Sequence, residues 1–231
     1  MIQEIYNVFI QCDQKITTDT RKISDGCIFF ALKGPNFNGN KFVGEALKKG
    51  AKFAIIDQKE FFIKDKTFVV NDVLSFLQKL ALYHRKKFNI PIIGITGTNG
   101  KTTTKELIGA VLSTKYNVLI TEGNLNNHIG VPLTLLQLKK EHKIGIIEMG
   151  ASKIGDIKEL AEIACPTHGI ITNIGKAHLE GFGSIENIKK TKLELYDFII
   201  ANKGEIIVNN EDDILKKRIP SFIKQFTYGT S

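Results

Sequence analysis

Five short apolar runs, separated by helical stretches, recur along the second part of the chain. PIIGIT, NVLIT, IGIIEM, GIITNI and EIIVN each have the length of a buried strand. The helical stretches between them are expected to begin near Lys101, His128, Gly155, Ser184 and Glu211. Strands joined by helical crossovers form a mostly parallel sheet with helices on both faces. The sequence therefore predicts an α/β fold that binds ligands beyond the carboxyl ends of its strands.

The first part of the chain shows a shorter version of the same alternation. The runs CIFFAL and KFAIID have the length of strands, and FVGEALKKGA between them has the apolar spacing of a helix. A short strand and a helix from about Asn71 to Phe88 follow, and Asn89 to Pro91 interrupts the pattern. We therefore expect two α/β domains, residues 1–88 and residues 89–231.

The formal net charge of +8 raises the possibility of a nucleic-acid-binding protein. Residues 1–90 hold 15 Lys and Arg against 9 Asp and Glu, whereas residues 91–231 hold 17 against 15. The excess is scattered Lys, without an Arg cluster or a basic stripe that contains aromatic residues. We expect a lysine-rich surface and no nucleic-acid partner, with an anionic ligand for the N-terminal part as the alternative.

Cysteine usage and hydropathy indicate a cytoplasmic protein. The three cysteines, Cys12, Cys27 and Cys165, form no CxxC pair, so we expect small buried hydrophobic residues and no disulfide framework. No apolar run reaches the roughly 18 residues that a membrane-spanning helix needs. The first residues also lack the basic and then apolar pattern of a signal sequence, so we expect no membrane insertion.

The stretch IIGITGTNGKTTTKEL joins a strand to a helix through a glycine loop. Its spacing, Gly97-x-x-Gly100-Lys101-Thr102, is shorter than the common phosphate-loop pattern GxxxxGK[ST]. Backbone N–H groups of such a loop bind phosphate oxygens, while Lys101 can reach the terminal phosphates and the Thr102 hydroxyl can ligate Mg²⁺. We expect a nucleotide-phosphate site here, and an ordinary tight turn capped by threonines is the alternative.

Two further side chains stand where ligands are expected. Glu148 ends the apolar run IGIIEM, a position at which nucleotide-hydrolysing folds hold Mg²⁺. A strand-ending acid that faces solvent is the alternative for this residue. His178 lies beside Glu180 in the glycine-flanked loop GKAHLEGFG, where a histidine more often faces solvent than binds a ligand.

Lys192 interrupts an apolar helix face. Ile185, Ile188, Leu195 and Ile199 recur at spacings of three and four residues, and this spacing passes through Lys192. The side chain can snorkel to solvent. Alternatively, desolvation lowers its pKa and leaves a neutral amine that can react with CO₂ to give a metal-binding carbamate. The residues by themselves leave both interpretations open.

Together these motifs resemble the Mur ligase family, the ATP-dependent amino-acid ligases of peptidoglycan precursor synthesis. The family's glycine loop resembles GTNGKTT, which accounts for the short spacing. The stretch TTDTRKISDGCIFFALKGPNFNGNKFVGEALKKGA resembles the family's N-terminal UDP-binding domain. NLNNHIGVPLTLL and AHLEGFGSIENIKKTKLEL resemble the member that joins D-alanyl-D-alanine to UDP-N-acetylmuramoyl-tripeptide. The resemblance extends over essentially the whole chain and implies a central ATP-binding domain of the P-loop type.

The resemblance also implies a role for each matching position. The ATP-binding residues would be Gly97, Thr98, Asn99, Gly100, Lys101, Thr102, Thr103 and Asn209, the last of these at the adenine. Two Mg²⁺ ions would be bound by Thr102, Glu148, His178 and, if it is carbamylated, Lys192. The catalytic residues would be Lys101, Glu148, His178 and Lys192. The two substrates, UDP-N-acetylmuramoyl-tripeptide and D-Ala-D-Ala, would be bound by Thr20, Arg21, Asn126 and Asn127.

The chain departs from the family pattern near both ends. NGNKF replaces a DGHDF-like run, and Thr20 replaces a more frequent Ser. Family members have a third, C-terminal Rossmann-like domain, and this chain stops at FTYGTS, about where that domain should begin. We therefore expect a chain that binds the UDP-linked peptide and ATP but ligates poorly alone. We also expect it to be a monomer. Alternatives are a nucleotide-binding module without turnover and a ligase of the folylpolyglutamate synthase type.

Overall fold

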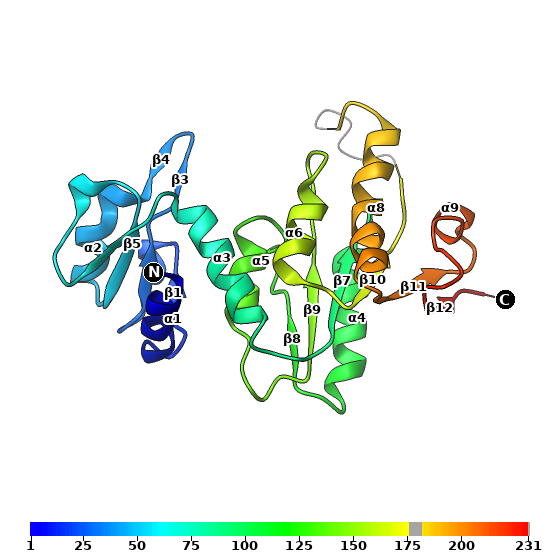
Figure 1. Cartoon of the computed structure of the whole chain (residues 1–231), viewed down its shortest axis with the longest axis horizontal. Helices are drawn as coiled ribbons and strands as arrows, with labels where there is room; N and C mark the ends of the chain where they lie inside the picture. Colours follow the sequence, from blue (N-terminus) through cyan, green and yellow to red (C-terminus); the bar gives the residue numbers. More distant parts are fainter. Residues whose placement is uncertain (176–181, 231) are drawn as a thin grey trace. The chain divides into compact units, whose positions relative to one another are not determined.

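The structure is a computed structural model that describes residues 1–175 and 182–230. The chain divides into two compact units, Met1–Tyr83 and His84–Ser231. Each unit contains a parallel β-sheet with helices beside it (Figure 1). The α/β fold class that the alternating pattern predicts is thus confirmed.

A four-stranded parallel sheet, in the order β1-β2-β5-β6, forms the centre of the N-terminal unit. Its strands are β1 (Ile16–Thr17), β2 (Ile28–Phe30), β5 (Phe53–Ile56) and β6 (Thr67–Val69). The accompanying elements are α1 (Ile2–Gln11), η1 (Thr20–Lys22), the hairpin β3 (Lys33–Gly34) and β4 (Phe37–Asn38), η2 (Gly39–Phe42), α2 (Val43–Lys48) and η3 (Lys59–Phe61). Phe29 of β2 and Ala54 of β5 pack with Ala46 of α2 in one buried cluster. The predicted strand–helix–strand unit therefore forms two layers, in which α2 packs against β2 and β5.

Helix α3 (Val73–Arg85) contains the division between the units, which lies before the predicted domain end at residue 88. The imidazole Nε2 of His84 lies 2.9 Å from the carbonyl oxygen of Leu138, and Arg85 Nε donates to the carbonyl of Ala164 over 3.0 Å. Both partners belong to the second unit. The predicted breaker at Asn89 to Pro91 follows the end of the helix. The second unit nevertheless begins at His84, inside the last turn of the helix, because the side chains of His84 and Arg85 are buried there.

A six-stranded parallel sheet forms the centre of the second unit, in the order β12-β11-β10-β7-β9-β8. Its strands are β7 (Ile92–Thr96), β8 (Val118–Ile120), β9 (Ile144–Glu148), β10 (His168–Ile171), β11 (Glu205–Asn209) and β12 (Gln225–Tyr228). The first five correspond to the five apolar runs. The sequence gives little indication of β12, because all four of its residues are exposed at the edge of the sheet.

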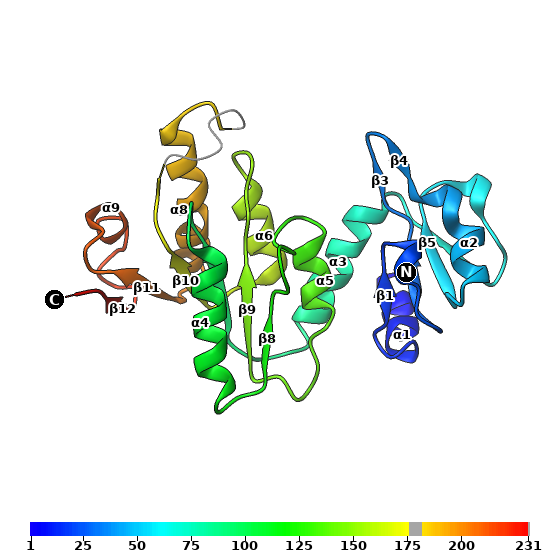
Figure 2. The same cartoon turned by 180° about the vertical axis from the view of Figure 1, so that it is seen from behind.

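Helices cover both faces of this sheet, as the opposite views of Figures 1 and 2 show. They are α4 (Lys101–Ser113), α5 (Gly130–Leu135), α6 (Asp156–Ala164), α8 (Ile185–Ala201) and the short α9 (Asp213–Lys216). Ile95 and Ile146 of the sheet pack with Ile108 of α4 on one face. On the other face a Cβ at Gly94 would lie 3.1 Å from Leu195 Cδ1, so this glycine allows α8 to approach β7 closely.

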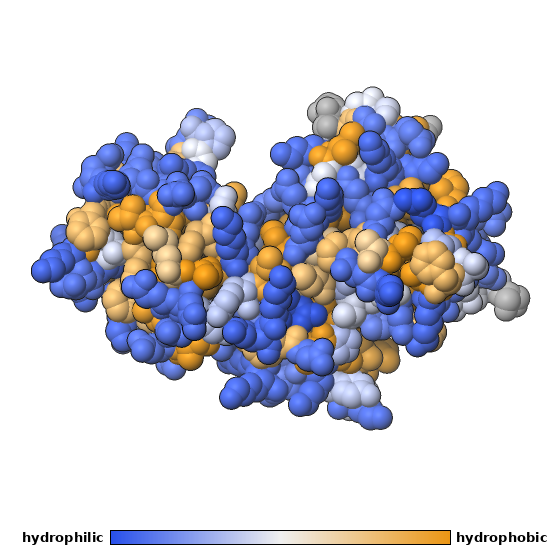
Figure 3. All heavy atoms as spheres, in the orientation of Figure 1, coloured by the Kyte–Doolittle hydropathy of each residue, from blue (hydrophilic) through white to orange (hydrophobic). Residues whose placement is uncertain are grey.

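The surface and the cysteines match the composition only in part, since Cys165 is not buried as expected. The face drawn in Figure 3 is mostly hydrophilic, with apolar residues in separate clusters. Within residues 1–175 and 182–230, no helix is both long and apolar enough to cross a membrane. All three cysteines are free; Cys12 and Cys27 are buried, and Cys165 is half-buried.

Candidate nucleotide-binding site

The first residue of the glycine loop between β7 and α4 has a backbone conformation that only glycine tolerates. Gly97 has a φ of +148°, and a Cβ there would collide with the Thr172 hydroxyl oxygen. Gly100, at +77°, is the N-cap of α4. Because a helix leaves its first N–H groups without intrahelical partners, the start of α4 presents free donors and the positive end of its dipole. The local structure thus has the geometry of an anion site.

The segment that follows β10 holds the glycine loop in place. The Asn173 carbonyl accepts from the N–H of Thr98 over 3.0 Å, and Asn173 Oδ1 accepts from the N–H of Asn99 over 3.1 Å. The Thr172 hydroxyl donates to the Asn99 carbonyl over 2.6 Å. Asn173 is a residue that the sequence analysis missed, although it lies near the end of the predicted run GIITNI, where ligand-binding residues are expected. The loop is therefore fixed by tertiary contacts and not only by its glycines.

Lys101 lies over the same loop. Its Nζ donates to the carbonyl of Gly97 over 2.9 Å and to that of Thr98 over 3.2 Å. Burial lowers the pKa of the Lys101 amine, and the negative charge of Glu148 partly opposes this effect. The amine is thus already held at the loop that would receive a phosphate group.

Glu148 ends β9 and meets the start of α4. The strands β7 and β9 are neighbours, and Ile95 is in register with Glu148. The Thr102 hydroxyl donates to Glu148 Oε2 over 3.0 Å, and Asn126 Nδ2 donates to Oε1 over 2.8 Å. Glu148 is only 1% exposed, so the alternative of a solvent-facing acid does not hold. Hydroxyl and carboxylate oxygens are the ligands that Mg²⁺ prefers, so the pair of Thr102 and Glu148 fits this ion.

Asn126 and Asn127 lie between β8 and α5. Asn127 Oδ1 accepts from the N–H groups of Ile129 and Gly130, and so caps the start of α5. Both asparagines line a pocket of about 270 Å³ in the second unit. Among the residues that the structure describes, the others that line it are Gly97, Thr98, Lys101, His128, Gly150, Ala151, Ser152, Asp156, Phe182, Ile188 and Lys192. The glycine loop, the segment that contains Asn126 and Asn127, and helix α8 thus all contribute to one pocket.

Lys192 occupies the buried face of α8, as its spacing predicts. It is 4% exposed, and Leu195 and Ile199 on the same face are fully buried. Burial lowers its pKa to about 8, the nearby charge of Lys101 acts in the same direction, and Asp156 and Glu194 oppose them. In the described part of the chain its Nζ has no hydrogen bond or ion pair. The side chain therefore lines the pocket and does not snorkel to bulk solvent.

Three further predicted positions do not line this pocket. Ile185 begins α8 and is exposed, so the buried apolar face starts at Ile188, one turn later than predicted. Asn209 ends β11, and its Oδ1 accepts from the N–H of Glu211 over 3.0 Å; it does not line the described pocket. Thr103 is exposed in the first turn of α4. His178 lies outside the described residues.

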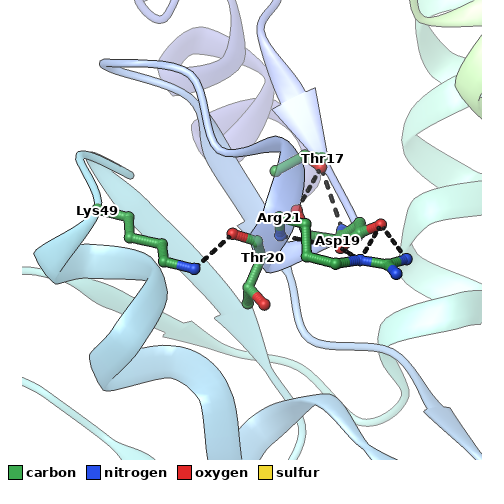
Figure 4. A network of polar contacts seen from close by, with 5 residues as sticks. All are labelled: Thr17, Asp19, Thr20, Arg21 and Lys49. Atoms are coloured by element: carbon green, nitrogen blue, oxygen red, sulfur yellow. Dashed lines mark hydrogen bonds and ion pairs between the residues drawn. The ribbon is translucent and has the colours of Figure 1, made fainter.

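Thr20 and Arg21 lie in the N-terminal unit, in η1. Arg21 Nε and Nη2 donate to the two carboxylate oxygens of Asp19 over 2.9 and 2.7 Å, and Lys49 Nζ donates to the Thr20 carbonyl over 3.2 Å (Figure 4). We call Thr17, Asp19, Thr20, Arg21 and Lys49 the Arg21 turn. Hydrogen bonds from the Arg21 side chain and N–H lower the pKa of Asp19 to about 2. The Arg21 side chain is nevertheless 85% exposed, so it is accessible to an anionic ligand.

Two family models match the chain, and their boundary lies within β7. The Mur ligase family, catalytic domain, matches residues 14–94, and the Mur ligase middle domain matches residues 95–231. The chain belongs to the Mur ligase family. The family prediction made from the glycine loop and its surroundings is confirmed.

Individual relatives agree with this assignment. The UDP-N-acetylmuramoyl-tripeptide--D-alanyl-D-alanine ligase of Bacillus subtilis is 39% identical over 93% of this chain, and the Synechocystis ligase of the same name is 42% identical over 93%. Among solved structures, MurF from Thermotoga maritima in complex with ADP superposes with a TM-score of 0.84 at 34% identity over 94% of this chain. The match covers 47%, 48% and 50% of these proteins, respectively, so the chain spans about half their length.

Proposed function

We propose that this chain forms the UDP-substrate-binding and ATP-binding part of a ligase that joins D-alanyl-D-alanine to UDP-N-acetylmuramoyl-tripeptide. The observation that carries the proposal is the oxygen pair of Thr102 and Glu148 beside a glycine loop, in a chain similar over 93% of its length to ligases of that name. Residues 1–88 would bind the UDP-linked substrate, and residues 89–231 would bind ATP.

The second unit supplies the groups for phosphoryl transfer. The free N–H groups at the start of α4 would bind phosphate oxygens, and Lys101 would move from the loop carbonyls to the terminal phosphate. Thr102 and Glu148 would hold Mg²⁺, which when bound neutralises phosphate charge that would otherwise repel an incoming carboxylate. His178 and Lys192, the latter as a carbamate formed from its neutral amine and CO₂ with loss of a proton, would hold a second ion.

The proposed reaction has two steps. The terminal phosphoryl group of ATP is transferred to the free carboxylate of the tripeptide, which gives an acyl phosphate and ADP. The amine of D-Ala-D-Ala then attacks the acyl carbon, phosphate leaves, and the nitrogen loses a proton as the amide forms. Such a reaction needs positioned phosphate-binding groups and no protein nucleophile.

The remaining predicted residues would position substrates. Thr20 and Arg21 would bind the UDP moiety, since an exposed guanidinium can form paired hydrogen bonds with a phosphate group. Asn126 and Asn127 would bind substrate in the pocket beside Lys101. Asn209 would contact adenine from the carboxyl end of β11. Support for these roles comes from the family resemblance and, for Asn126 and Asn127, from their place in the pocket beside Lys101.

Thermal denaturation with each candidate substrate tests the proposal. We expect UDP-N-acetylmuramoyl-tripeptide to raise the melting temperature, because a ligand at about 100 times its Kd adds about 2.7 kcal/mol to the free energy of unfolding. Arg21→Met should reduce this increase and leave the increase caused by Mg·ATP unchanged. An increase with a pterin-glutamate, and none with the UDP-linked peptide, would favour the folylpolyglutamate synthase type. An increase with Mg·ATP alone would favour a nucleotide-binding module.

A further inference from the structure

Lys105 is a charged side chain that is enclosed completely within the second unit. It is 0% exposed and lies in the second turn of α4, on the same helix face as the buried Gly109. Lysine is almost never fully buried unless its ammonium group is paired, because removing an unpaired charge from water is costly. The surroundings of the ammonium group therefore show what the side chain contributes.

The Lys105 ammonium connects the ends of two neighbouring strands. Its Nζ donates to the carbonyl of Thr121 over 2.6 Å and to that of Gly123 over 3.4 Å, both just beyond β8. On its other side it lies 3.0 Å from Glu106 Oε1 and 3.9 Å from Glu148 Oε2. One side chain thus joins helix α4, the segment after β8 and the carboxylate at the end of β9.

The segment after β8 is also attached to Glu148 directly. The N–H of Glu148 donates to Thr121 Oγ1 over 3.0 Å, and Asn126 Nδ2 donates to Glu148 Oε1. The carbonyl of Asn126 in turn accepts from the N–H of Gly150 over 2.7 Å. Lys105 therefore anchors the start of a segment whose later residue orients the same carboxylate. Both oxygens of Glu148 depend on this arrangement.

We propose that Lys105 is a positioning residue for the magnesium-binding carboxylate of Glu148. It acts through Glu148 and through residues 121–126, and it does not itself touch the nucleotide. The inference rests on the proposed function, since that function makes Glu148 a magnesium ligand. Removing a group that orients a metal ligand through a hydrogen bond or an ion pair commonly lowers metal affinity by 10- to 100-fold.

The effect of magnesium on nucleotide binding measures this role. The affinity of the 231-residue chain for a non-hydrolysable ATP analogue is determined by calorimetry, once with Mg²⁺ and once with EDTA. In Lys105→Met, which keeps the side-chain length but removes the charge, we expect the gain in affinity caused by Mg²⁺ to fall by about tenfold. The affinity in EDTA should stay within about twofold of the parent, because the phosphate loop does not contain Lys105.

Two further variants make the experiment decisive. Lys115→Met removes an exposed lysine just beyond α4 and should leave both affinities unchanged. Lys105→Gln replaces the charged ammonium donor with a neutral amide donor, and it carries the test if Lys105→Met does not fold. Circular dichroism and the melting temperature establish that each variant is folded before its affinity is compared.

The outcomes separate the two proposals. A folded Lys105→Met variant with the parental gain from Mg²⁺ would overturn the positioning role. An equal loss of affinity with Mg²⁺ and with EDTA would overturn it as well, because that result indicates general damage to the fold. A parent chain that binds no nucleotide, or gains nothing from Mg²⁺, would instead contradict the proposed function.

Discussion

Two of the clusters of charged side chains in this protein have sharply different surroundings. Beside the glycine loop of the second unit, Lys105, Glu148 and Lys192 are each at most 4% exposed. In the Arg21 turn of the N-terminal unit, the Arg21 side chain is 85% exposed. Buried charges interact strongly because little water screens them, whereas an exposed ion pair contributes about 0–1 kcal/mol. The first cluster is a fixed arrangement, and the second can reorganise around a ligand at little cost.

Gly97→Ala should produce the largest effect of the changes considered. The substitution places a Cβ against the Thr172 hydroxyl oxygen at a φ of +148°, so we expect the free energy of unfolding to fall by about 3 kcal/mol. Chemical denaturation measures the loss. Gly100→Ala is the matched control, since its left-handed backbone has no atom within 4 Å of an added Cβ, and it should cost about 1 kcal/mol. Equal losses in the two variants would contradict the predicted collision between an added Cβ and the Thr172 hydroxyl oxygen.

Lys101→Met should weaken binding of ATP more than it changes stability. A charge-assisted hydrogen bond to phosphate is worth about 2 kcal/mol, so we expect about a thirtyfold loss of affinity in a calorimetric titration. Lys158→Met, an exposed lysine of α6, is the control and should bind ATP as the parent does. If Lys101→Met also bound ATP as the parent does, the amine over the glycine loop would have no part in phosphate binding.

Lys192→Met should raise stability, in contrast to the two changes above. Within the described residues the Lys192 ammonium has no hydrogen bond or ion pair, so an apolar side chain of similar length removes a desolvation cost. We expect a gain of about 1 kcal/mol and a melting temperature higher by about 3 °C in CO₂-free buffer. Lys190→Met on the exposed side of α8 should change neither. A marked loss of stability would mean that the ammonium has a stabilising partner.

The exposed ion pair of the Arg21 turn should give the smallest effect. Asp19 has a pKa of about 2, below its ordinary value, so its pairing with Arg21 is complete above about pH 4 and is lost as the pH falls towards 2. A carboxyl NMR titration should find this midpoint in the parent and a return to the ordinary value in Arg21→Met. Stability at neutral pH should change little in that variant. A parent Asp19 that titrates at its ordinary value would contradict the pairing.

Patterns of local periodicity predicted the central features of the site. The strand, the glycine loop and the helix around Gly97 could each be predicted, because each of them depends on residues that are adjacent in the sequence. Glu148 lies at a strand end, and the three-and-four spacing of α8 placed Lys192 on a buried face. The same spacing argument could have found Lys105, which follows Lys101 by one turn and precedes the buried Gly109 by another.

Other features depend on contacts between distant residues. Asn173 acts on the glycine loop only because β10 lies beside β7 in the sheet, and the order of strands is not written in any local pattern. The division inside α3 likewise depends on what surrounds His84 and Arg85. The edge strand β12 has no buried face, so its residues lack the alternation that marks other strands.

Hydrogen exchange with and without Mg·ATP tests most directly the claim that the glycine loop and its surroundings form the nucleotide site. We predict slower amide exchange in peptides that contain Gly97 to Thr104, and in those that contain residues 121–127 and Glu148. Peptides of the N-terminal unit should not change on addition of Mg·ATP. Saturating Mg·ATP that leaves residues 97–104 unaltered, or that protects only the N-terminal unit, would contradict the account.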